Sequence, residues 1–75
     1  MERVVIAVEQ SAIAANKVLN ELVVSGDYRP AYIEGKFIRY RRMVDDRAEE
    51  ISVDQTGPVR YEVYRETKEV GVMEH

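Results

Sequence analysis

The fold is decided by the stretch Lys36-Phe37-Ile38-Arg39-Tyr40-Arg41-Arg42-Met43-Val44. Aromatic and β-branched residues favour extended structure, and successive side chains of a strand point to opposite faces. One face of the predicted strand is mainly apolar and holds Ile38, Tyr40 and Val44, with Arg42 as the exception. The other face mixes cations with apolar side chains and holds Phe37, Arg39, Arg41 and Met43. The stretch therefore predicts a strand with two faces of different chemistry.

Turn signals flank this strand and recur toward the C-terminus. Glycine, proline and short polar residues mark the predicted turns at residues 34–36, 45–48 and 54–58. The segments between them predict antiparallel strands at residues 31–33, 37–44, 49–53 and 59–65. The segment Glu69 to Met73 alternates weakly and adds a possible short edge strand. These signals predict a meander of three to five strands.

The N-terminal third predicts a helix over residues 12–24. Apolar residues recur there at helical spacing, Ser11 is a good N-cap residue, and Gly26 predicts a left-handed C-terminal cap. Residues 1–8 allow two structures. Their apolar spacing extends the helix and would permit a coiled-coil seam, whereas the β-branched run from Val4 to Val8 favours a strand. We favour the strand, and the helix then packs on the chain's own sheet.

Together these elements predict an α+β fold. It has one main N-terminal helix packed on a three- to five-stranded antiparallel meander sheet, and residues 1–75 form one small domain. Alternation assigns the faces, with the sets that contain Ile38 and Val63 turned toward the helix. The opposite face is then left open to solvent or to a partner.

The open face supplies the candidate site. Its predicted residues combine arginines with apolar and aromatic side chains: Phe37, Arg39, Arg41, Met43, Arg60 and Tyr64. Such residues are enriched in protein–protein interfaces, where the arginines make charge-assisted hydrogen bonds. The simplest alternative is a solvated face with cross-strand Arg–Glu pairs. A second alternative is single-stranded nucleic acid, with bases stacked on the aromatic rings.

The charge distribution favours a protein partner over nucleic acid. The 75 residues carry a net charge of −3. Residues 28–44 hold five cations and one acid, for +4, and residues 45–54 hold one cation and five acids, for −4. A phosphate backbone is bound through a surplus of cations, which this chain lacks overall. We therefore expect a non-enzymatic module that binds a protein.

Catalytic and metal-binding patterns are sparse in the sequence. There is no cysteine, and the single histidine is His75, so Ser–His and Cys–His nucleophile systems have no local basis. The acidic run Asp45, Asp46, Glu49 and Glu50 could hold a hard cation, but it lacks the alternating ligands and central glycine of a calcium loop. A solvated turn is the better interpretation. We expect no enzyme, no cofactor and no metal.

Size and apolar content predict self-association. A chain of 75 residues without disulfides or zinc has a marginal core, and oligomerisation is the remaining means of stabilising it. Several apolar residues lie off the main helical stripe: Ile6, Ile13, Val18, Val23 and Val24. We therefore expect a homodimer. No apolar run approaches the roughly 20 residues of a membrane span, and the lack of cysteine fits a cytoplasmic protein.

Overall fold

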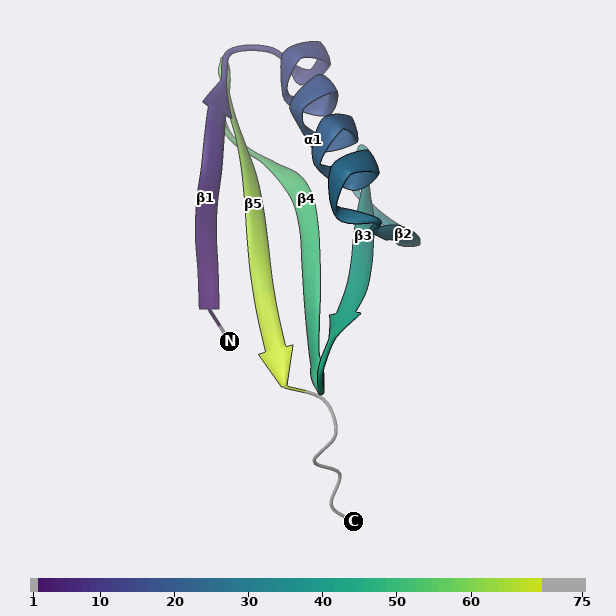
Figure 1. The fold of residues 1–75 in the computed structure, drawn as a ribbon. Helices are drawn as coiled ribbons and strands as arrows, with labels where there is room; N and C mark the ends of the chain where they lie inside the picture. Colours follow the sequence, from purple (N-terminus) through teal and green to yellow (C-terminus); the bar gives the residue numbers. More distant parts are fainter. Residues whose placement is uncertain (1, 70–75) are drawn as a thin grey trace.

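A computed structural model describes residues 2–69, which form one helix and five strands (Figure 1). The elements are β1 (Glu2–Glu9), α1 (Ala12–Gly26), β2 (Arg29–Glu34), β3 (Phe37–Val44), β4 (Arg47–Gly57) and β5 (Arg60–Glu69). All neighbouring strands are antiparallel, in the order β1-β5-β4-β3-β2. The predicted α+β class, a helix on an antiparallel sheet, is confirmed.

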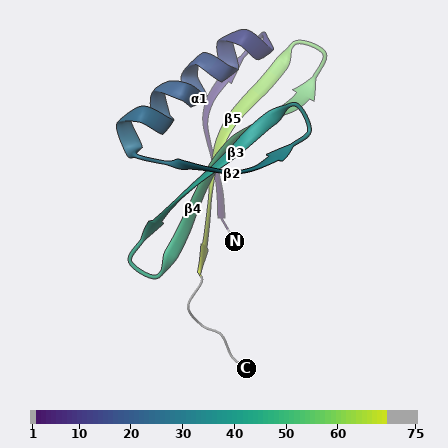
Figure 2. The ribbon, with the colours of Figure 1, turned by 90° about the vertical axis from the view of Figure 1, so that its right-hand side faces the viewer.

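The first described strand, β1, pairs with the last, β5, and the sheet is open with β1 and β2 at its edges. β2 to β5 form a meander of hairpins, as predicted, and β1 lies beside β5 at the far edge. α1 carries the chain from the β1 edge to the β2 edge, crossing the sheet on one side (Figures 1 and 2). Because residues 2–9 form a strand, the helical extension and its coiled-coil seam are wrong, and the preference for a strand is confirmed.

The two ends of α1 show one correct and one incorrect prediction. Ser11 is the N-cap, and its Oγ accepts a hydrogen bond from the Ala14 amide at 3.1 Å. At the other end Asp27, and not Gly26, takes the left-handed conformation, with φ 57°. Gly26 serves a different purpose, because a Cβ there would lie 2.6 Å from the ring of Tyr28. The glycine therefore makes room for a core side chain.

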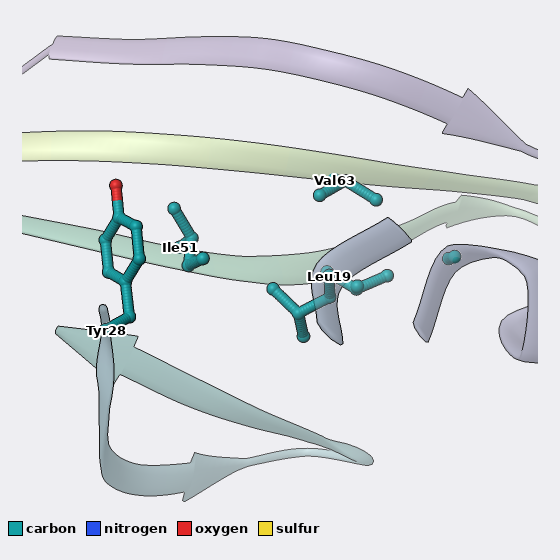
Figure 3. Packing of buried hydrophobic residues seen from close by; sticks show 6 residues of the cluster. Leu19, Tyr28, Ile51 and Val63 are labelled. Atoms are coloured by element: carbon teal, nitrogen blue, oxygen red, sulfur yellow. The ribbon is translucent and has the colours of Figure 1, made fainter. Parts of the chain in front are cut away.

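The core lies between α1 and the middle of the sheet (Figure 3). Its buried members are Ala15, Leu19, Tyr28, Ile51, Val53 and Val63. Leu19 and Val63 are fully buried, and Tyr40 packs against the cluster from β3. This confirms that the face of β5 with Val63 meets the helix. Burial of such aliphatic side chains contributes roughly 1.5–3 kcal/mol each.

The strands are longer than the turn signals indicated. The second turn is only Asp45-Asp46, so Ala48 is a buried strand residue rather than part of a turn. β4 continues to Gly57 through an irregularity after Gln55, because its ladder with β5 overrides the local turn composition. The third turn therefore lies at residues 58–59. Beyond Glu69, the predicted edge strand falls outside the described residues.

The outer side of α1 keeps some of the surplus apolar residues exposed. Ile13 is 85% exposed and Val24 is 82% exposed, whereas Val18 and Val23 pack against the core. Within residues 2–69 no helix has the length and apolar character needed to cross a membrane. The core is therefore small, and apolar surface remains outside it.

Candidate functional site

The face of the sheet opposite α1 carries a row of charges across all five strands. Cross-strand partners in the ladder point to the same side. From the β2 edge to the β1 edge the row reads Arg29, Arg41, Glu50, Glu66 and Arg3. We call this surface the charged face. No helix covers it among the described residues, and α1 lies on the other side (Figure 1).

Two carboxylates stand directly opposite each other in this row, and Arg39 compensates them. Glu50 and Glu66 are register partners on β4 and β5, an arrangement that is destabilising for like charges. Arg39 lies between them. Its Nε donates to Glu50 Oε1 at 2.6 Å, and its Nη2 donates to Glu66 Oε1. The side chains of Arg39, Glu50 and Glu66 are only 6%, 1% and 8% exposed.

Arg39 also fixes an aromatic ring and a residue of the neighbouring edge strand. Its Nη1 donates to the hydroxyl of Tyr64 at 2.8 Å and to Glu34 Oε1 at 3.1 Å. Tyr64 is itself 4% exposed. We refer to Arg39, Glu50, Tyr64 and Glu66 as the buried cluster. Within residues 2–69 every buried side-chain nitrogen and oxygen has a hydrogen-bond partner, so the cluster is internally satisfied.

Further cations surround the two carboxylates. Arg41 Nε donates to Glu50 Oε2 at 2.7 Å, and Lys68 Nζ lies 3.5 Å from Glu50 Oε1. Arg3 Nη2 donates to Glu66 Oε2 at 2.8 Å, and the Arg3 guanidinium lies 3.9 Å from the centre of the Tyr64 ring. The flanking side chains of Arg3 and Arg41 are 41% and 46% exposed. The charged face is thus a network of ion pairs with a buried centre and accessible margins.

The electrostatics of the buried cluster hold its groups in fixed charge states. Burial alone would raise the pKa of Glu50, but hydrogen bonds from Arg39 and Arg41 outweigh it and lower that pKa. Burial likewise opposes, and bonds from Arg3 and Arg39 produce, a lowered pKa for Glu66. Burial raises the pKa of Tyr64 despite the nearby arginines. These directions keep both carboxylates charged and the phenol of Tyr64 neutral near pH 7.

Strand register puts the predicted site residues on the side of the charged face, and Arg39, Arg41 and Tyr64 lie in the buried cluster or beside it. Arg39, Arg41 and Met43 lie on β3, and Tyr64 lies on β5. Met43 is 56% exposed, as expected for an open face. The expectation that Arg39 and Tyr64 are displayed to solvent is wrong, because the paired carboxylates draw both side chains into the buried cluster.

The other two predicted residues lie on the same side of the sheet but at its ends, away from the buried cluster. Phe37 stands opposite Glu34, which binds Arg39, so the ladder puts it on the side of the charged face, but its ring packs against the core, edge-to-face to Tyr61 at 6.3 Å between centroids. A large apolar ring gains more from that packing than from a polar surface, so Phe37 is half-buried rather than displayed to solvent. Arg60 begins β5 and pairs with Glu62 of the same strand at 3.0 Å. It lies at the end of the sheet, apart from the buried cluster.

The acidic run does not converge on a point. Asp45 and Asp46 form the β3–β4 turn. Glu49 and Glu50 point to opposite faces of β4, and Glu49 accepts from Arg42 at 2.9 Å. In the described part of the chain, no three histidine, aspartate or glutamate side chains gather as metal ligands. The two acidic strand residues instead serve as partners for arginine.

Arg3, Glu50 and Glu66 lie outside the set of site residues that the sequence predicts. Glu50 falls in the predicted strand 49–53, but its acidic run is interpreted as a solvated turn, and the sequence predicts no pairing of residues 2–9 with residues 61–67. Strand alternation places Glu66 on the same face as Tyr64, which was an available signal.

Comparison with protein-family models, curated proteins and solved structures found no match to this chain.

Proposed function

We propose that this chain is a small non-enzymatic protein-binding module that binds an acidic, partly apolar protein surface. The binding residues are the accessible ones at the β2–β3 side of the charged face: Arg29, Tyr32, Arg41 and Met43. One observation carries the proposal. Arg29 and Arg41 stand directly opposite each other in the β2–β3 ladder, and like charges in that position repel. Glu50 already pairs with Arg41, so Arg29 is the cation for which a carboxylate from a partner would relieve this repulsion.

Accessibility and apolar area support the same surface. The side chain of Arg29 is 79% exposed, and its only ion pair in the described chain is a 3.6 Å contact with the exposed Asp27. Met43 and Tyr32 are 56% and 46% exposed and supply apolar area beside the cations. Arginine, tyrosine and methionine are enriched in interfaces.

The buried cluster supports binding indirectly. Arg41 is held by Glu50, and Glu50 is itself fixed by Arg39, so the position of Arg41 is set before a partner arrives. Preorganised side chains lose less conformational entropy on binding. Arg39 and Tyr64, for which the sequence predicts direct contact with a partner, become positioning residues in this proposal.

Nucleic acid is the weaker alternative. Tyr64 is buried and cannot stack on a base without leaving the cluster, and Arg39 is saturated by its own carboxylates. The net charge of −3 also opposes a polyanion. The proposal includes a cytoplasmic location, which the absence of cysteine favours.

The test is affinity capture with a matched pair of double variants. Arg29→Glu/Met43→Ser changes two exposed residues of the proposed surface and leaves the buried cluster intact. Arg60→Glu/Val59→Ser makes the same chemical changes at the far end of the sheet, where Val59 is 66% exposed. We expect the first variant to lose partners that the wild type and the second variant retain. Equal recovery by all three proteins would refute this surface.

A further inference from the structure

The two edge strands of the sheet differ in their protection against pairing. β2 contains Pro30, an irregularity between Pro30 and Tyr32, and charged residues at both ends. Proline, bulges and charges are the usual means by which an edge strand avoids added strands. β1 also has an irregularity, between Val5 and Ala7, but it has no proline, and an aliphatic stretch from Val4 to Val8 lies between its charged ends.

The aliphatic residues of β1 are accessible. Val4, Val5, Ile6 and Val8 are 42%, 45%, 40% and 46% exposed. β5 occupies one side of β1, and no other strand of residues 2–69 lies on its outer side (Figure 1). The backbone groups along that outer side are a template for another strand.

We propose that β1 pairs antiparallel with β1 of a second copy across a two-fold axis, joining two sheets into one continuous sheet. A two-fold interface requires a surface that is complementary to itself. An aliphatic centre with charged ends meets this requirement when the register keeps like charges apart. The proposal rests on β1 alone and is independent of the surface around Arg41.

The irregularity in β1 restricts the register. Against β5, the side chains of Arg3, Val5 and Val8 fall on the charged face, whereas those of Val4 and Ala7 fall on the helix side. The regular alternation of side chains between the two faces is interrupted at Ile6, between Val5 and Ala7. Residues directly opposite in a ladder point to the same side, so only registers that match these sides are allowed.

Charge then decides between the two central registers that match. In the first register, Val4 stands opposite Ala7 of the second copy, and Glu2 stands opposite Glu9 on the same side of the sheet. The two-fold axis produces this Glu2–Glu9 pair twice. Like charges directly opposite are destabilising. The second register is shifted by two residues. It places Val5 opposite Val8 and Val4 opposite Glu9, and no like charges stand opposite each other. We assign this second register, which gathers four valines on the charged-face side next to Tyr64.

Pairing of the two copies would also stabilise a domain whose own core is small. A chain of 75 residues with no cysteine has no covalent staple, and the surface that β1 exposes is apolar. Adding a strand covers that surface and satisfies the outward backbone groups together. A second copy is always present at the protein's own concentration.

The first test measures mass in solution by size-exclusion chromatography with light scattering. The chain mass is 8.7 kDa, and we expect the wild type to have twice that mass. Ile6→Lys places a charge on the proposed edge and should give a monomer. Ile33→Lys is the matched control on β2, where Ile33 is 73% exposed, and should remain a dimer. A monomeric wild type, or a dimer that survives Ile6→Lys, overturns the proposal.

The second test reads the register in folded protein. Val5→Cys/Val8→Cys should form a disulfide-linked dimer under mild oxidation, and the natural chain has no cysteine to interfere. Positions three apart on one strand are about 10 Å apart, beyond the reach of a bond within one chain. Val4→Cys/Ala7→Cys reports the rejected register and should stay uncrosslinked. Crosslinking of this control alone, or of neither variant, overturns the assigned register.

Discussion

Removal of the Arg39 side chain should destabilise the domain more than removal of any other charge on the charged face. Arg39→Met leaves Glu50 and Glu66 opposite each other with no cation between them, at 1% and 8% side-chain exposure. Breaking a buried ion pair by removing one partner costs about 3–5 kcal/mol. A domain of this size has a free energy of unfolding of about 4–11 kcal/mol, so the loss is a large part of the total.

The assay is urea denaturation followed by circular dichroism, with Arg41→Met as the matched control. Arg41 also binds Glu50, but its side chain is 46% exposed and solvent screens the pair, so we expect a loss of only about 1 kcal/mol. Arg39→Lys keeps the charge but cannot span both carboxylates, and it should fall between the two. If the unfolding free energies of Arg39→Met and Arg41→Met differ by less than about 1 kcal/mol, the buried cluster does not stabilise the fold.

Three further predictions concern pH and the ends of the helix. The lowered pKa values of Glu50 and Glu66 mean that their stabilisation is complete above the ordinary carboxylate pKa of about 4.3 and is lost as pH falls through the folded values. Melting temperatures measured from about pH 6 to about pH 3 should therefore fall, and Glu66→Gln should reduce this dependence. Ser11→Ala removes the cap on the Ala14 amide and should cost about 1 kcal/mol in urea denaturation, whereas an unchanged midpoint would contradict the capping role. Asp27→Gly relieves a left-handed residue and should raise the unfolding free energy by about 0.5–1 kcal/mol, a prediction that any decrease would contradict.

Local chemistry predicted most of the fold. Ser11 caps the helix, the Gly35 turn joins β2 to β3 with φ 66°, and alternation placed Val63 against the helix. What the sequence left undetermined was which strand pairs with β1. That pairing depends on contacts between the two ends of the chain, which no local propensity encodes. The turn at Asp45 was predicted too long because an aspartate can itself take the left-handed conformation that a two-residue turn needs.

The candidate site was only partly predictable. Alternation put Arg39, Arg41, Met43 and Tyr64 on one face, and the structure places all four there. Alternation says nothing about burial, however, and long side chains that lie flat over paired strands can bury one another without a second layer. The carboxylates that draw Arg39 inward come from strands whose register was unknown, so exposed and buried members of the face could not be separated.

The pairing of β1 with β5 has a consequence for synthesis of the chain on the ribosome. β1 is made first, but in the described structure its hydrogen-bonding partner is the last strand to be made. The hairpins from β2 to β5 join neighbours in sequence and can form as they emerge, whereas β1 must wait until residues 61–67 are free to receive it. Folding of this domain is therefore expected to finish only after its translation is nearly complete. A nascent chain stalled before β5 would display an aliphatic strand to the cell's chaperones.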